Sequence, residues 1–260
     1  MMLKTITRNL CPPLIWHGAA AVKRSLSEQP PPPPAYGFTG SYANYDDAMK
    51  ECEGYDADCA VQYAILETRK ICQDAPLDSR TMRLLAAFKM ASHIGPLRVL
   101  DFGGSLGGHY LLLNRFLNIE SWTVCELPKM AHAGRDYHGP HERLTFITNI
   151  YGCAPNVILA SGALQACSSP YSEISRLLET GARYFIVDRV PLLSEERLTV
   201  HRVPPHIYPG SYPDWFFSES KFLEAFSGCT LRLRWRLEEH MAHLDGILQD
   251  VYGGFLFERI

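Results

Sequence analysis

Residues 99–110 read Val-Leu-Asp-Phe-Gly-Gly-Ser-Leu-Gly-Gly-His-Tyr, and this stretch decides the fold. The apolar run that ends at Asp101 predicts a buried strand, and the glycines after it predict a tight turn. Glycine lets backbone amides approach a ligand that a side chain would hold away, and a following helix points its positive end at such a turn. A strand, a glycine-rich turn and a helix in this order indicate a cofactor-binding α/β domain.

The chain after Leu97 alternates short apolar runs with helical patterns, which is typical of a parallel sheet built from strand–helix–strand units. Strands are expected over residues 98–102, 122–126, 144–148, 157–160 and 184–188, and helices over 108–116, 128–136, 170–179 and 219–226. Two later extended segments, 230–237 and 251–258, are expected to pair antiparallel. The predicted fold is α/β, with a Rossmann-like, mostly parallel seven-stranded sheet and an antiparallel C-terminal strand pair.

The chain upstream of this sheet changes character twice. Residues 1–34 are expected to form an N-terminal leader and proline-rich spacer, because the proline run from Pro30 to Pro34 fits neither a helix interior nor a central strand. Residues 35–94 are expected to form a helical cap, which leaves 95–260 as the Rossmann-like domain. Residues 1–27 lack acidic side chains, and we interpret them either as a peripheral membrane anchor or as a strap across the domain.

Composition limits the partners of the chain. The 260 residues carry a formal net charge of -3 without a basic patch, so no nucleic-acid partner is expected. The eight cysteines are scattered without zinc-site spacing, and the grouping of His243 with Asp245 lacks a third ligand. We therefore expect no metal and a reduced, cytoplasmic protein, and the oligomeric state stays open.

Glu126 is the second chemically informative residue. It ends the next predicted strand, 25 residues after Asp101, where an acidic side chain can accept hydrogen bonds from the hydroxyls of a ribose. This spacing is shared by nucleotide-binding and methyl-donor folds. It predicts an adenosine-containing ligand without choosing between them.

The glycine turn resembles the first motif of class I S-adenosylmethionine-dependent methyltransferases, D-x-G-x-G-x-G, with Ser105 at the middle glycine. Five parallel strands closed by a terminal antiparallel pair are similar to the fold of that superfamily, and Val157 to Gln165 resembles its fourth-strand motif. The resemblance implies S-adenosylmethionine as the cofactor. The cofactor-binding residues that we assign from the ribose spacing and this resemblance together are Asp101, Gly103, Gly104, Ser105, Gly107, Glu126, Asn149, Ser161 and Gly162.

From about Tyr36 to Ile260 the chain also resembles a family of uncharacterised bacterial methyltransferases that is known from sequence alone, some of them found among polysaccharide-biosynthesis genes. The segments that carry this resemblance are Phe38 to Tyr42, Asp101 to Tyr110, Ala160 to Gly162, Val187 to Pro191, Arg202 to Pro205 and Gly254 to Arg259. It implies a methyltransferase with a small-molecule or saccharide acceptor, directed at oxygen or nitrogen.

The segment 188–215 follows the fifth parallel strand and is expected to be a substrate loop, because ligands of open parallel sheets bind beyond the carboxyl ends of the strands. Its proposed substrate-binding residues are Arg189, Arg202, Tyr208, Tyr212 and Trp215, which offer guanidinium groups for an anion and rings for stacking. His201, His206 and His240 are candidates for a general base, since imidazole titrates near neutral pH. The catalytic set that we predict is His201, His240 and Asp188, with Asp188 orienting a base or binding substrate.

Two other classes of protein stay open. An NAD(P)-dependent oxidoreductase shares the ribose-binding acid, although the acidic residue before the glycines disfavours it. A non-catalytic methyltransferase fold that acts as a binding protein is favoured by Ser105 and by the absence of an acidic residue at Thr148 or Asn149.

Overall fold

The computed structural model of the chain describes residues 36–55, 57–72 and 77–260. The predicted leader and spacer, with the proposed membrane contact of residues 1–27, lie outside these residues. Within them, no helix combines the length and the apolar character needed to cross a lipid bilayer.

A parallel sheet forms where the alternating pattern predicts it. Its strands are β3 (Leu97–Phe102), β4 (Ile119–Cys125), β5 (Leu144–Ile147), β6 (Val157–Ser161) and β7 (Tyr184–Leu193). They lie in the spatial order β5-β4-β3-β6-β7, and β13 (Tyr252–Arg259) continues the sheet antiparallel to β7 while pairing with β10 (Cys229–Arg236). The predicted α/β fold class and the antiparallel terminal pair are confirmed.

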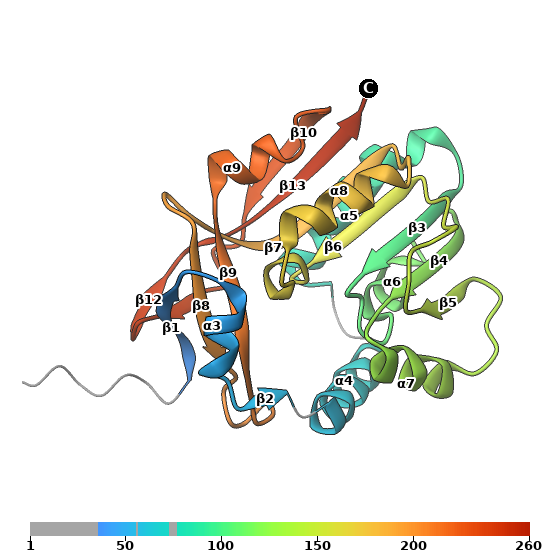
Figure 1. The fold of residues 1–260 in the computed structure, drawn as a ribbon. Coiled ribbons are helices and arrows are strands. Elements are labelled where there is room, and N and C mark those ends of the chain that lie inside the picture. Colours follow the sequence, from blue (N-terminus) through green and yellow to red (C-terminus); the bar gives the residue numbers. More distant parts are fainter. Residues whose placement is uncertain (1–35, 56, 73–76) are drawn as a thin grey trace, which may run out of the picture. The chain divides into compact units, whose positions relative to one another are not determined.

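Helices cover both faces of this sheet because its strands are apolar on both sides. The helices α5 (Ser79–Ala91), α6 (Gly108–Leu113) and α7 (Pro128–His138) pack on one face, in a core that includes Phe88 and Trp122. The helices α8 (Pro170–Glu179) and α9 (Glu219–Glu224) pack on the other, in a core that includes Ile174 and Phe222. Figure 1 shows α5 and α8 on opposite sides of β6.

The sheet has thirteen strands in the described part of the chain, more than the seven that we expected. The additional strands are β1 (Gly37–Tyr42), β2 (Gly54–Tyr55), β8 (Arg197–Arg202), β9 (Gly210–Ser218), β11 (Ala242–Leu244) and β12 (Ile247–Gln249). They join the parallel part through the end of β7, where Leu192 pairs with Phe217 of β9.

The expected substrate loop is therefore largely an antiparallel hairpin of β8 and β9. Its prolines made the segment look irregular, but Pro204, Pro205 and Pro209 all lie in the turn between the two strands. Val200 is fully buried on β8, so the strand carries a core residue that the loop interpretation overlooked.

The segment that we expected to be a helical cap contains strands as well as helices. Its helices are α3 (Tyr45–Lys50), α4 (Ala57–Cys72), α5 and the short 3-10 turn η1 (Ser92–Ile94). Its strand β1 pairs with β8 and β11, which belong to the later part of the chain. The division of the chain into leader, cap and Rossmann-like domain stays a prediction.

Candidate functional site

Three polar side chains form a row where the parallel pairing of β3, β6 and β7 ends. The three residues are Asp101 of β3, Ser161 of β6 and Asp188 of β7. They lie on the face of the sheet that α5 covers, and Ser161 and Asp188 are register partners. Their side chains are almost completely buried, with relative exposures of 0%, 2% and 0%. Buried carboxylates are stable only with hydrogen-bond partners, so the neighbours of this row determine its chemistry.

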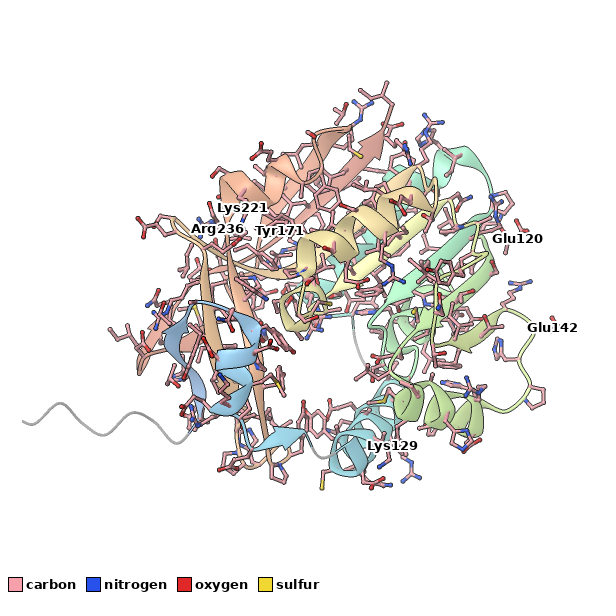
Figure 2. The ribbon with its side chains drawn as sticks, viewed as in Figure 1. Glu120, Lys129, Glu142, Tyr171, Lys221 and Arg236 are labelled. Carbon is pink, nitrogen blue, oxygen red and sulfur yellow. The ribbon has the colours of Figure 1, made fainter. Side chains whose placement is uncertain are left out.

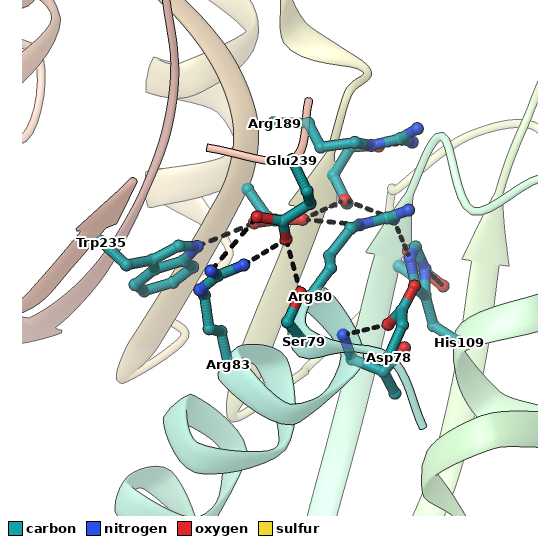
Figure 3. Close-up of polar contacts among 12 residues, drawn as sticks. Asp78, Ser79, Arg80, Arg83, His109, Arg189, Trp235 and Glu239 are labelled. Atoms are coloured by element: carbon teal, nitrogen blue, oxygen red, sulfur yellow. Dashed lines mark hydrogen bonds and ion pairs between the residues drawn. The ribbon is translucent and has the colours of Figure 1, made fainter. Parts of the chain in front are cut away.

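Arg80, in the first turn of α5, connects the members of the row (Figure 3). Its Nε donates to Asp188 Oδ2 at 3.2 Å, and its Nη2 donates to Ser161 Oγ at 3.3 Å and to His109 Nε2 at 3.1 Å. Because a guanidinium only donates, His109 accepts through Nε2 and carries its proton on Nδ1, 3.3 Å from Asp101 Oδ2. One cation therefore links the carboxylates of β3 and β7, directly on one side and through a neutral imidazole on the other.

Asp101 and Asp188 each accept a hydrogen bond from a tryptophan indole. Trp122 Nε1 donates to Asp101 Oδ2 at 3.1 Å, and Trp235 Nε1 donates to Asp188 Oδ1 at 2.9 Å. Ser161 Oγ adds a donor to Asp188 at 2.9 Å. Within the described residues, the side-chain hydrogen bonds of Asp188 run to Trp235, Ser161 and Arg80, and none runs to His201 or His240.

The turn after β3 adopts a left-handed backbone at three positions. The φ angles are +70° at Gly103, +53° at Ser105 and +75° at Gly107. Ser105 thus takes the conformation that a glycine would take at this place, at the energetic cost that a Cβ atom imposes there. A Cβ atom on Gly104 would lie 2.4 Å from Asp101 Cγ, so the turn packs directly on the buried carboxylate.

Glu126 follows the last residue of β4 and holds the turn from the next strand. Its Oε1 accepts the backbone N–H of Ser105 at 3.0 Å, and its Oε2 accepts that of Leu127 at 2.9 Å. The pKa of Glu126 is raised, chiefly by burial, against the lowering effect of these two hydrogen bonds, and the charge of Asp101 adds to the increase. Each carboxylate oxygen has a second lone pair, so the group can still accept hydroxyl donors from a ligand.

The remaining cofactor candidates lie along the same edge of the sheet. Asn149 follows β5 and is exposed, with its Oδ1 accepting the amide of Tyr151 at 2.9 Å. Asp101 Oδ1 is buried and has no hydrogen-bond partner among the described residues. The structure therefore brings the predicted cofactor residues of β3, β4, β5 and β6 to one edge.

Arg189 lies beside the end of β6. It follows Asp188 with a left-handed φ of +53°, and its Nη2 donates to the carbonyl oxygen of Ser161 at 2.9 Å. Its guanidinium fills the space over Gly162, where an added Cβ atom would lie 2.7 Å from Nη2. Burial lowers the pKa of Arg189 to about 10, with a further decrease from Arg80.

His201 belongs to a second polar cluster, on the β8–β9 hairpin. Its Nδ1 lies 3.1 Å from the hydroxyl of Tyr212 and 3.8 Å from Asp214 Oδ2, and its ring stacks on Phe38 at 4.2 Å. Burial lowers the pKa of His201 to about 4 and raises that of Asp214. The carboxylate beside His201 is therefore Asp214, which sequence analysis did not select, rather than Asp188.

His240 is exposed on the loop after β10, and its ring packs against Tyr252 at a centroid distance of 4.5 Å. Although the residue is exposed, partial desolvation of its imidazole lowers the pKa of His240. The charges of Arg189 and Arg80 lower it further, and those of Asp188 and Glu239 raise it.

The other predicted substrate residues lie on the hairpin or its turn. Arg202 Nη1 donates to Thr39 Oγ1 at 2.8 Å, and Trp215 Nε1 donates to the carbonyl oxygen of Cys167 at 3.1 Å. The ring centroids of Tyr208 and Tyr63 are 5.9 Å apart. The candidate base His206 lies in the same turn and is exposed. Arg202 and Trp215 are thus engaged in holding β1 and the 3-10 turn η2 (Leu164–Ala166) to the hairpin.

Sequence reasoning missed Arg80, His109, Trp122 and Trp235. His109 carried a usable signal, because it lies in the glycine motif and faces back toward Asp101 from the first turn of α6. Arg80 and Trp235 carried none, since they come from α5 and β10, far from the motif along the chain.

No family model matches the chain, and no curated protein matches its sequence. Among solved structures, it is similar to the magnesium protoporphyrin IX methyltransferase of Synechocystis with bound S-adenosylhomocysteine, at 13% identity and a TM-score of 0.48, over 74% of this chain and 92% of that one. It is also similar to an amino pentose methyltransferase of Micromonospora echinaspora with bound S-adenosylmethionine, at 13% identity and a TM-score of 0.48, over 75% and 97%. A third is the 1,6-didemethyltoxoflavin-N1-methyltransferase of Burkholderia thailandensis, at 17% identity and a TM-score of 0.46, over 78% and 88%. Because the sequence identities and TM-scores are this low, the function of the chain has to be argued from the site itself.

Proposed function

We propose that this chain is an S-adenosylmethionine-dependent methyltransferase that acts on a small-molecule or saccharide acceptor, at oxygen or nitrogen. The observation that carries the proposal is the turn after β3, in which Ser105 has a left-handed backbone and donates its amide to Glu126. The middle position of the motif thus has the conformation of glycine although its residue is serine. The serine at this position is therefore compatible with a turn that binds a cofactor.

The residues at the sheet edge fit an adenosine-containing sulfonium ligand. Glu126 supplies a carboxylate acceptor for ribose hydroxyls, and Asp101 Oδ1 is a buried acceptor that lacks a donor among the described residues. Gly103 and Gly107 supply the left-handed backbone that shapes the turn, and Asn149 lies just after the end of β5. When bound there, the cofactor supplies a methyl group on a positively charged sulfur, which an acceptor atom can attack.

The contribution of the chain's own residues to methyl transfer would be to orient the acceptor. Arg80 holds Ser161 and Asp188 in place, so the end of β6 offers a fixed small-residue wall at Ser161 and Gly162. In-line methyl transfer depends on such positioning of the acceptor. His201, whose pKa is lowered to about 4, is neutral at physiological pH and can accept a hydrogen bond, but so low a pKa makes it a weak general base, so His240 is the stronger candidate for that role.

Binding of S-adenosylhomocysteine and of NADH, measured by calorimetry, tests the proposal. We expect S-adenosylhomocysteine to bind with micromolar affinity, about -8 kcal/mol, and NADH not to bind. Heat with NADH alone would indicate an oxidoreductase. No heat with either ligand would favour a non-catalytic binding protein.

Glu126→Ala should weaken binding of S-adenosylhomocysteine by about 1–3 kcal/mol, because charged hydrogen bonds to the ribose are lost. The matched control is Glu142→Ala, which removes an exposed carboxylate in the turn between α7 and β5 (Figure 2). The control should bind with unchanged affinity. Equal affinities for both variants would show that Glu126 does not contact the ligand.

A further inference from the structure

Arg189 is a largely buried cation that forms no ion pair with another described residue. Its hydrogen bond runs to the neutral carbonyl oxygen of Ser161, and its Nε is buried with no partner among the described residues. Its sequence neighbour Asp188 uses its oxygens for Ser161, Arg80 and Trp235 instead. A guanidinium is always charged in proteins, and burying it without a counter-ion is costly.

The backbone is also arranged to keep this guanidinium where it is. Arg189 has a left-handed φ of +53°, which is strained for a residue with a side chain, and Gly162 has a φ of +69°. The space that a Cβ atom of Gly162 would fill is occupied by the guanidinium. Strain of this kind persists at functional sites when the surrounding structure gains something from it.

The surroundings of Arg189 suit the polar part of a ligand. Burial and Arg80 lower the pKa of Arg189, while Asp188, Tyr252 and Tyr212 raise it. Figure 3 shows the side chains of Arg189 and Arg80 near one another. A second cation thus lies beside Arg189, whereas the carboxylate of Asp188 is already engaged.

We propose that Arg189 binds an oxyanion, a carboxylate or a phosphate monoester, of the acceptor molecule. The planar guanidinium forms paired hydrogen bonds with such a group. The inference rests on the proposed function, because it places the acceptor beside Ser161 and Gly162. It narrows the acceptor class to anionic small molecules or anionic saccharides.

Inorganic phosphate and acetate are the probes for this site. Thermal unfolding is followed against probe concentration at constant ionic strength, with chloride as the reference salt, because a ligand that binds only the folded state stabilises it. We expect at least one probe to bind the unmodified chain, and Arg189→Gln to weaken it at least tenfold, which corresponds to about 1.4 kcal/mol. Arg236→Gln is the control, since it removes an exposed arginine whose nearest acid, Asp250, is 3.7 Å away (Figure 2).

A second variant covers the case in which Arg189→Gln does not fold. Arg189→Gly removes the guanidinium but accepts the left-handed backbone without strain, so it should fold and lose the probe affinity. Equal probe affinities for Arg189→Gly and the unmodified chain would overturn the proposal, as would a chain that binds neither probe.

Binding of S-adenosylhomocysteine separates this proposal from the proposed function. We expect phosphate or acetate to bind to the unmodified chain together with S-adenosylhomocysteine. If S-adenosylhomocysteine displaces the probe and binds more weakly to the variant, the oxyanion at Arg189 is that of the cofactor and the acceptor assignment is wrong. The titrations with phosphate and acetate need no S-adenosylhomocysteine. They therefore test the oxyanion site at Arg189 even if the chain does not bind S-adenosylhomocysteine.

Discussion

Three acidic residues of the site have different hydrogen-bond partners: the buried Asp101 and Asp188 and the half-buried Glu126. Asp101 relies on the neutral donors Trp122 and His109, Glu126 on two backbone amides, and Asp188 on an indole, a hydroxyl and the guanidinium of Arg80. Hydrogen bonds from neutral donors stabilise a charge without placing a second charge in the interior. One guanidinium, that of Arg80, is therefore enough to connect the carboxylates of β3 and β7.

His201 should make the folded state sensitive to acid. The unfolded imidazole takes up a proton below pH 6.5, whereas the folded one, buried among Phe38, Tyr212 and Asp214, stays neutral down to about pH 4. The unfolded state then binds more protons, so stability falls as pH decreases through this range, by at most about 3 kcal/mol. We expect His201→Gln to flatten this part of the curve of unfolding free energy against pH. Chemical denaturation between pH 4 and 7 measures it, and a variant curve parallel to that of the unmodified chain would contradict the assigned shift.

At the scale of elements, α5 is fixed to the sheet at its N-terminal end. Asp78 caps the helix by accepting the amide of Thr81 at 2.7 Å, and Arg83 and Ser79 both bind Glu239. The first turn of α5, which carries Arg80, is thus held from the loop after β10 as well as from the strands (Figure 3).

The other face is connected in a similar way by Glu196. Its carboxylate accepts from Lys221 of α9 at 2.5 Å and from the hydroxyl of Tyr171 of α8. Lys221 Nζ also lies 4.6 Å from the ring of Tyr171 (Figure 2). The two helices that cover this face are therefore linked by the turn between β7 and β8.

The turn between β3 and α6 should not tolerate a larger residue at its second glycine. Gly104→Ala places a methyl group 2.4 Å from the carboxyl carbon of Asp101, and overpacking of this kind costs about 1–3 kcal/mol. Gly228→Ala is the control, because a Cβ atom there has no neighbour within 4 Å and the backbone is not left-handed. Urea unfolding compares the two. Equal losses of stability would show that the turn does not pack on Asp101 as the structure has it.

For the molecule as a whole, the leader and proline-rich spacer are predicted to end at a boundary between residues 34 and 35. All residues of the proposed site lie after this boundary. We expect deletion of residues 1–34 to leave the affinity for S-adenosylhomocysteine unchanged within about twofold, as measured by calorimetry. Circular dichroism is the control for folding, and a deletion variant that does not fold would show that these residues belong to the domain.

The parallel sheet, the glycine turn and the acidic residues at the ends of β3 and β4 could be predicted from the sequence alone. These features depend on local order, because the spacing of apolar residues and glycines reports which side of a strand is buried and where the chain turns. The same reasoning ended the fifth parallel strand at Asp188, whereas β7 continues to Leu193 and carries Asp188 and Arg189 near its middle.

The tertiary structure decided which distant segments cover those strand ends. Arg80 from α5 and Trp235 from β10 complete the site around Asp188, and Asp214 rather than Asp188 lies beside His201. The extension of the sheet through β8 and β9 also depends on pairing with β1 and β7. A periodic pattern shows that a face is buried but not which segment buries it, since that depends on packing between residues far apart in the chain.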